Sequence, residues 1–125
     1  MIKYPLNFAT SFYFLWTFIH AWERKCTPFM TGCALCFGSS VSYYATNHRY
    51  IRNIDRVICQ CSIVYFLYYS ASLSGYYLVA LLCLGPIIWL YRRNTEISHS
   101  VLHFVANVGV SLAIESCYTT GCGLC

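Results

Sequence analysis

Charged residues are scarce in this chain. Asp, Glu, Lys and Arg together make up 10% of its 125 residues, and only four residues are acidic. An ordinary soluble domain carries roughly 25% charged residues. The chain therefore has too little charge to cover a water-exposed surface, which excludes a conventional soluble domain. We expect the lipid bilayer to be the solvent for most of its surface.

Hydrophobic residues take the place of the missing charge. They make up 58% of the chain, its mean hydropathy is +0.54, and they gather in stretches separated by short groups of Arg and Lys. A helix needs about 20 such residues to cross a bilayer, and the alternating pattern of a membrane barrel is absent. We predict a single-domain, all-α, polytopic transmembrane bundle with about five spans, near residues 6–22, 28–46, 54–70, 75–91 and 97–116.

Two local signals refine these spans. The chain carries no charge from Val57 to Tyr91, which is far longer than one crossing. The small polar segment Ser70–Gly75 supplies a turn that divides this stretch into two spans. Pro86 is expected to kink the second of them, because proline removes a backbone hydrogen bond from the helix.

Basic residues predict the orientation in the membrane. Five crossings place the N-terminus and the loops before the third span and after the fourth on one side. The other side holds only Arg24 and Lys25, whereas this side holds six basic residues: Lys3, Arg49, Arg52, Arg56, Arg92 and Arg93. The positive-inside rule then puts the N-terminus inside and the C-terminus outside. We expect a multi-pass protein of an organelle inner membrane or endomembrane, with no nucleic-acid partner, since topology already explains the net charge of +4.

His99 and His103 are candidate metal ligands. They are four residues apart, so on a helix their rings project from one face about one turn apart. Imidazole is the commonest side-chain metal ligand, and such a pair needs one or two more ligands to hold zinc. The alternative is that these are two histidines at the membrane interface, near the start of a helix.

Asp55 is the second candidate, because an acidic residue at membrane depth is costly. It is equally explained as a first-turn acid that meets the positive end of the helix dipole. The predicted topology brings the end of the second span and the starts of the third and fifth to one side of the membrane. Polar residues from the three spans would thus converge at one depth: Ser40, Tyr44, His48, Asp55, His99 and His103.

We expect simpler roles for the remaining polar residues and cysteines. His20 and Glu115 are expected to pair with each other or with Arg24 and Lys25. Cys33 and Cys36 have the spacing of a redox pair, but within membrane helices cysteines serve mostly as small packing residues. We expect that role for all five cysteines within the spans: Cys33, Cys36, Cys59, Cys61 and Cys83. The tail holds three cysteines: Cys117, Cys122 and Cys125. If the tail lies on the predicted outer side, oxidation would link two of them. If the topology is inverted, they become candidates for acylation.

The segment Ser39–Thr46, followed by Asp55 and then by His99-x3-His103, resembles the alkaline ceramidase and adiponectin-receptor superfamily of seven-helix membrane hydrolases. In ceramidases the pattern is Ser-x3-His-x10-Asp, then His-x3-His on the last helix. The resemblance implies a zinc site held by three histidines, with Ser40 and Asp55 assisting a zinc-bound water that attacks a lipid amide. Here Tyr44 occupies the position of the first zinc histidine, His48 is one turn further along as a substitute ligand, and the chain has room for about five helices.

Two functions follow from the sequence. The first is a non-catalytic accessory or structural subunit of a larger membrane complex, with lipids and other transmembrane subunits as its partners. Gly32, Ala34, Gly38 and Ser42 would form its close-packing face. The alternative is a zinc-dependent intramembrane hydrolase that uses Ser40, Asp55, His99, His103 and His48. A channel or transporter is disfavoured, because too few charged residues lie within the spans to outline a path.

Overall fold

The computed structural model describes residues 3–72, 77–93 and 95–120, and the helices in these ranges confirm the predicted all-α class. The helices are α1 (Pro5–Thr10), α2 (Tyr13–Glu23), α3 (Thr27–Thr46), α4 (Arg49–Ser72), α5 (Tyr77–Arg93) and α6 (Glu96–Thr120). The predicted turn at residues 70–75 falls partly within α4, which continues to Ser72, and partly outside the described residues. Pro86 lies inside α5.

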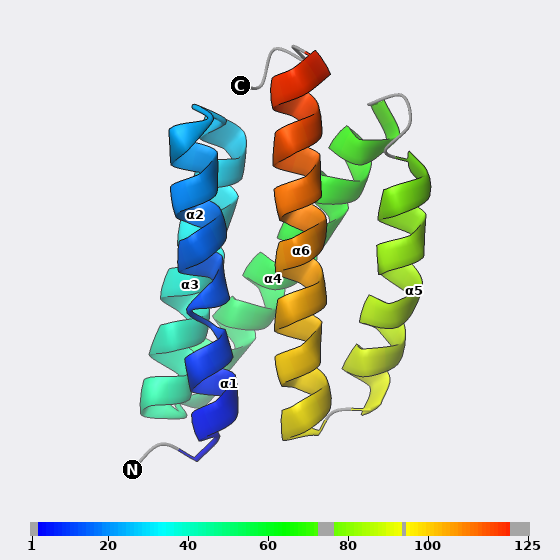
Figure 1. Cartoon of the computed structure of the whole chain (residues 1–125). Helices are drawn as coiled ribbons and strands as arrows, with labels where there is room; N and C mark the ends of the chain where they lie inside the picture. The colour runs from blue at the N-terminus through cyan, green and yellow to red at the C-terminus, as the bar shows by residue number, and fades with distance from the viewer. Residues whose placement is uncertain (1–2, 73–76, 94, 121–125) are drawn as a thin grey trace.

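The first predicted span is divided into α1 and α2. At Ser11 and Phe12 the backbone tightens locally: the N–H of Phe12 donates to the carbonyl of Ala9, and that of Phe14 donates to the carbonyl of Ser11. The Ser11 hydroxyl donates to the carbonyl of Asn7 at 2.7 Å, a bond that bends helices. The divided segment still runs along one side of the bundle in a single direction (Figure 1).

If α1 and α2 are counted as one segment, the helices run alternately up and down, so that α1 begins at one end of the bundle and α6 finishes at the other (Figure 1). We call the end with the start of α1 and the α3–α4 and α5–α6 connections the basic end. It holds the six basic residues that the sequence assigns to one side: Lys3, Arg49, Arg52, Arg56, Arg92 and Arg93. We call the opposite end, with the α2–α3 connection, the cysteine end.

Helices α3 and α6 each pack against three others. Helix α3 contacts α1, α2 and α4, and α6 contacts α1, α2 and α5. A buried cluster near the cysteine end joins α2, α3 and α6: Ala21, Cys26, Phe29, Ala113, Ile114 and Cys117. Cys26 and Cys117 are each disulfide-bonded. The predicted link joins two of the tail cysteines to each other and does not include Cys26, so it stays a prediction. Cys122, Cys125 and the side chain of Cys83 lie outside the described residues.

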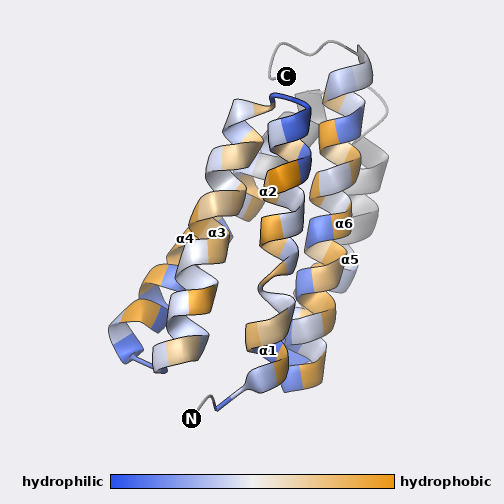
Figure 2. Cartoon of the chain, turned by 60° about the vertical axis from the view of Figure 1, so that its left-hand side comes forward, coloured by the Kyte–Doolittle hydropathy of each residue, from blue (hydrophilic) through white to orange (hydrophobic). Residues whose placement is uncertain are grey.

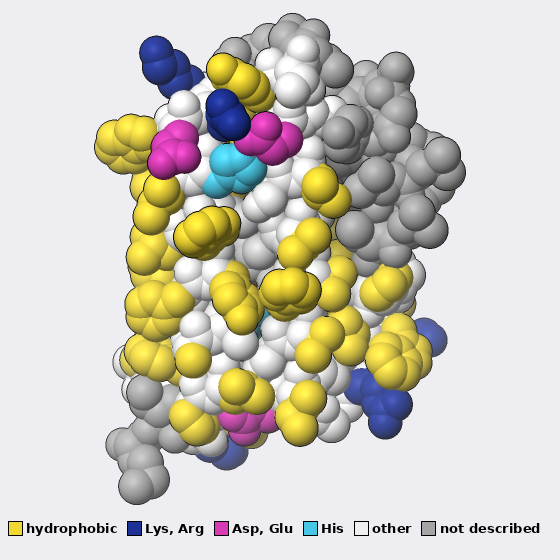
Figure 3. Space-filling view, in the orientation of Figure 1, with side chains coloured by type: hydrophobic (Ala, Val, Ile, Leu, Met, Phe, Trp, Pro, Cys, Tyr) yellow, Lys and Arg dark blue, Asp and Glu magenta, His cyan; other side chains and the backbone are white. Residues whose placement is uncertain are grey.

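The outer surface is strongly apolar. Trp16, Val64 and Ile97 expose 73%, 66% and 70% of their surface. Hydrophobic side chains cover the middle of the face in Figure 3, with Lys and Arg side chains at its upper and lower margins, and polar residues gather at the helix ends in Figure 2. By length and composition, one of the described helices, over Glu96–Thr119, is able to cross a membrane.

Candidate functional site

Asp55 is the hub of a buried polar cluster between α3 and α4. Its Oδ1 atom accepts hydrogen bonds from the hydroxyls of Ser39 and Ser40, both at 2.8 Å. Ser40 is fully buried and Asp55 is 6% exposed. The thiol of Cys59, one turn along α4, lies 3.6 Å from the same oxygen. Packing of α3 against α4 therefore gives this carboxylate its partners within the chain.

His99 and His103 face this cluster from α6. Their ring centroids are 4.6 Å apart, as the four-residue spacing predicts for neighbours on one face. Tyr44 of α3 is 3% exposed, and its ring centroid lies 6.0 Å from His99 and 6.2 Å from His103. The structure thus brings together Ser40, Tyr44, Asp55, His99 and His103, with the Tyr44 ring packed edge-on against both imidazoles.

His103 is held by a chain of hydrogen bonds that indicates its tautomer. Its Nδ1 atom lies 2.9 Å from the Thr10 hydroxyl oxygen. The Thr10 hydroxyl also lies 3.2 Å from the Asn7 carbonyl, which only accepts. If Thr10 donates its one proton to Asn7, its oxygen accepts from Nδ1–H of His103, and we assign the His103 lone pair to Nε2 on this basis.

Two further pairs extend this contact along α6. Asn7 Oδ1 accepts from Ser100 at 2.7 Å, and the Thr17 hydroxyl donates to Asn107 Oδ1 at 2.8 Å. Sequence reasoning missed these pairs and the role of Thr10. A signal was present, because the polar residues of the first span recur at helical intervals and face a matching row: residues 7, 10 and 17 opposite 100, 103 and 107.

A separate ionic cluster lies toward the cysteine end. Glu115 accepts from His20 Nε2 at 2.5 Å and from Arg24 Nε at 2.8 Å, which confirms the predicted pairing. The hydrogen bond to this carboxylate raises the pKa of the Arg24 guanidinium above its usual value. The cluster joins the end of α2 to α6 and lies apart from Asp55 and the paired histidines.

The described residues do not complete a zinc site. His48 is exposed, and its ring stacks on Tyr50 at the basic end with a centroid distance of 5.7 Å. Among the residues that the structure describes, no group of three or more His, Cys, Asp or Glu side chains is arranged to hold a metal ion. Catalytic zinc sites use three protein ligands, so the His99–His103 pair is one short.

Comparison with known proteins adds no relative: no protein-family model, curated protein or solved structure matches the chain. The resemblance to the ceramidase superfamily therefore stays a prediction. The geometry itself shows a polar cluster that links α1, α3, α4 and α6 near the basic end of the bundle.

Proposed function

We propose that this chain is a non-catalytic accessory subunit of a larger membrane complex, built on a degenerate ceramidase-like bundle. The observation that carries the proposal is that the buried Asp55 and His103 side chains already have hydrogen-bond partners within the chain. Asp55 accepts from two serines, His103 is paired with Thr10, and Tyr44 fills the space beside both imidazoles. Such a cluster fixes the positions of helices in lipid, where an unpaired polar group is costly.

We propose that the bundle crosses the membrane five times. The apolar middle and the charged ends support this arrangement, and so do the alternating helix directions. Helices α1 and α2 together, from Pro5 to Glu23, approach the roughly 20 residues that a crossing needs. The basic end would face the inside. The disulfide-bonded Cys26 and Cys117 would then lie in an oxidising outer compartment, where disulfides persist.

A face of small residues on α3 would allow a helix of a partner subunit to pack closely against it. Ala34, Gly38 and Ser42 recur every four residues and are exposed, so none of the residues that the structure describes packs closely over them. A Cβ atom added to Gly38 would meet no atom within 4 Å. Gly32 does not share this face, because six residues separate it from Gly38, roughly 240° around the helix. The corrected stripe is the type that lets two membrane helices approach closely.

Replacing Gly38 with leucine should release the partner subunit without unfolding the chain. The new side chain has open space in the chain itself but would separate two closely packed helices. We expect co-isolation of the partner from membranes in mild detergent to fall about tenfold. Gly32→Leu is the matched control, since a Cβ there also meets nothing within 4 Å. Equal co-isolation by both variants would contradict a partner on this face.

The second candidate is a lipid-amide hydrolase. The observation in its favour is that Ser40, Asp55, His99 and His103 come from three helices and gather at one depth. Its missing metal ligand would have to come from another subunit. Hydrolysis of ceramide by the purified complex, abolished in His99→Ala, would establish this function and refute the non-catalytic one.

A further inference from the structure

Two free thiols, Cys36 and Cys59, lie side by side in the antiparallel pair of helices α3 and α4 (Figure 1). The Ser40 hydroxyl donates to Asp55 Oδ1 at 2.8 Å. One turn earlier in α3, the Cys36 thiol donates to the Ser62 hydroxyl oxygen at 3.3 Å. Cys59 lies between Asp55 and Ser62 on the same face of α4. Its thiol is therefore placed against that of Cys36, and the two side chains are hydrogen-bonded to each other.

This pair is not the one that has redox spacing in the sequence. Cys33 is three residues before Cys36 in α3, but its side chain is hydrogen-bonded to Thr17 of α2. Cys36 faces α4 instead, since its thiol donates to Ser62. A disulfide bond needs two neighbouring side chains whose sulfur atoms can meet. Packing of the helices supplies such a pair in Cys36 and Cys59.

The two thiols differ in their access to a reagent. Cys36 is 4% exposed, whereas Cys59 is partly exposed. The Cys59 thiol also donates to Asp55 Oδ1, at 3.6 Å, so a proton acceptor lies next to it. Disulfide exchange begins when an accessible thiolate attacks a sulfur atom. Of the two residues, Cys59 is thus the one that a reagent reaches first.

We infer that Cys36 and Cys59 form a reversible redox site that an organic disulfide oxidises. The Cys59 thiolate attacks one sulfur of that disulfide and displaces the first of its thiolates, which leaves a mixed disulfide on Cys59. The Cys36 thiolate then attacks the Cys59 sulfur and displaces the second. The S–S bond of the reagent breaks and is reduced, the Cys36–Cys59 bond forms, and the two protons of the pair leave on the two released thiols.

The oxidised site would join α3 to α4 and leave the polar cluster in place. Asp55 loses the Cys59 thiol as a donor but keeps the hydroxyls of Ser39 and Ser40. The new bond lies within one chain, so it needs no partner subunit. The inference therefore goes beyond the accessory role and does not depend on it.

Oxidation of membranes that contain the full-length chain tests the site. Dithiodipyridine is an apolar disulfide that enters lipid, and mass spectrometry of the digested protein identifies the linked cysteines. We expect a Cys36–Cys59 link that dithiothreitol reverses. In Cys36→Ser, Cys59 should hold the reagent as a mixed disulfide. In Cys59→Ser, the buried Cys36 should react about tenfold more slowly or less.

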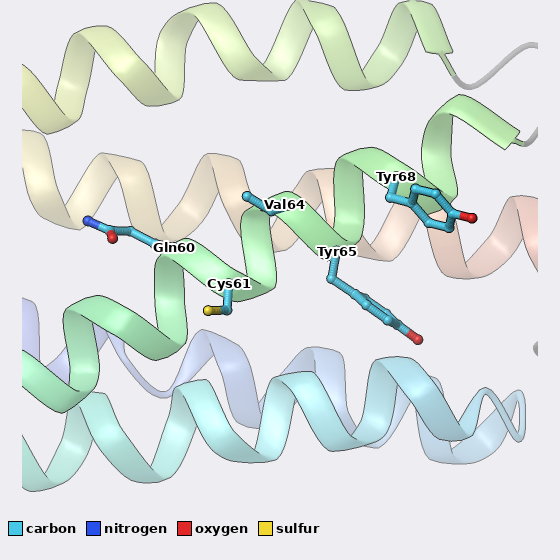
Figure 4. A pocket seen from close by; sticks show the side chains of 5 residues that line it. All are labelled: Gln60, Cys61, Val64, Tyr65 and Tyr68. Atoms are coloured by element: carbon cyan, nitrogen blue, oxygen red, sulfur yellow. The ribbon is translucent and has the colours of Figure 1, made fainter.

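Cys61 is the matched control for access and for pairing. It is an exposed free thiol on α4, roughly 200° around the helix from Cys59. The Cys36–Cys59 link should therefore persist in Cys61→Ser. Cys61 lines a hollow on the surface of α4 with four other residues, as Figure 4 shows: Gln60, Val64, Tyr65 and Tyr68.

Two results would overturn the redox site. One is a fully modified Cys61 in chains whose Cys36 and Cys59 remain free thiols, because the reagent would then have reached α4 without oxidising the pair. The other is a link that joins Cys36 to Cys33 or to Cys61 in place of Cys59. Co-isolation of the partner tests the accessory role separately, so failure of either proposal is distinguishable from failure of the other.

Discussion

Replacing Tyr44 with histidine should convert a chain with little zinc into one that holds about one zinc ion. The Tyr44 ring is buried and packs against both His99 and His103, the only described imidazoles in the cluster. A neutral phenol is a poor zinc ligand, whereas a third imidazole completes the minimum set of a catalytic site. Elemental analysis of the purified, dialysed protein measures the change, and we expect less than about one tenth of an ion per wild-type chain.

Two further variants show whether the gained metal is bound at the cluster. Tyr44→Phe keeps the ring but supplies no ligand, so its zinc content should match that of the wild type. Adding His103→Ala to the Tyr44→His chain should remove the ion again. If the wild-type protein holds a full zinc ion and loses it in His99→Ala, the site is complete without a histidine at position 44.

Replacing Asp55 with alanine should lower the free energy of unfolding by about 2 kcal/mol. The fully buried Ser40 hydroxyl has Asp55 as its acceptor, whereas Ser39 also lies 3.3 Å from the carbonyl of Cys36. Most of the lost stability in Asp55→Ala therefore comes from leaving the buried Ser40 hydroxyl without an acceptor. Asp55→Asn keeps an acceptor oxygen and should stay within about 1 kcal/mol of the wild type. Denaturant titration in detergent micelles measures both variants.

A double-mutant cycle isolates the bond itself. Ser40→Ala should destabilise the wild-type chain but have little further effect once Asp55 is alanine, because the two residues act as one unit. Full additivity of the two substitutions would show that the Ser40–Asp55 bond does not stabilise the fold. A purely catalytic carboxylate predicts the opposite pattern, with unchanged stability in both variants and loss of activity in Asp55→Asn.

The positions of the helices were predictable from hydrophobicity, but the start of α4 and the division between α1 and α2 were not. The predicted third span began at residue 54, whereas α4 begins at Arg49, because its first turn is polar and precedes the apolar stretch. Asn47 ends α3 with a φ of 54°, a left-handed conformation that asparagine tolerates. The division at Ser11 depends on a hydroxyl bonding to its own helix, which a hydropathy profile does not detect.

The gathering of the site residues was also predictable, because topology placed three helix ends at the same side. The hydrogen-bond partner of each site side chain was not predictable from the sequence. Thr10 pairs with His103 through contact between α1 and α6, two segments at opposite ends of the sequence. The sequence left two positions open for His48: on the helix face of Tyr44 one turn further along, or outside the helix. It lies after the left-handed Asn47, outside α3, so the helical spacing does not apply to it.

Tag accessibility in sealed membranes tests the five-crossing bundle most directly. One chain carries a short epitope at its N-terminus and another carries it at its C-terminus, and protease is added from each side in turn. The account predicts that the two termini are cleaved from opposite sides, with the N-terminus on the inner side together with the basic end. Cleavage of both termini from the same side would contradict the five-crossing bundle and its orientation.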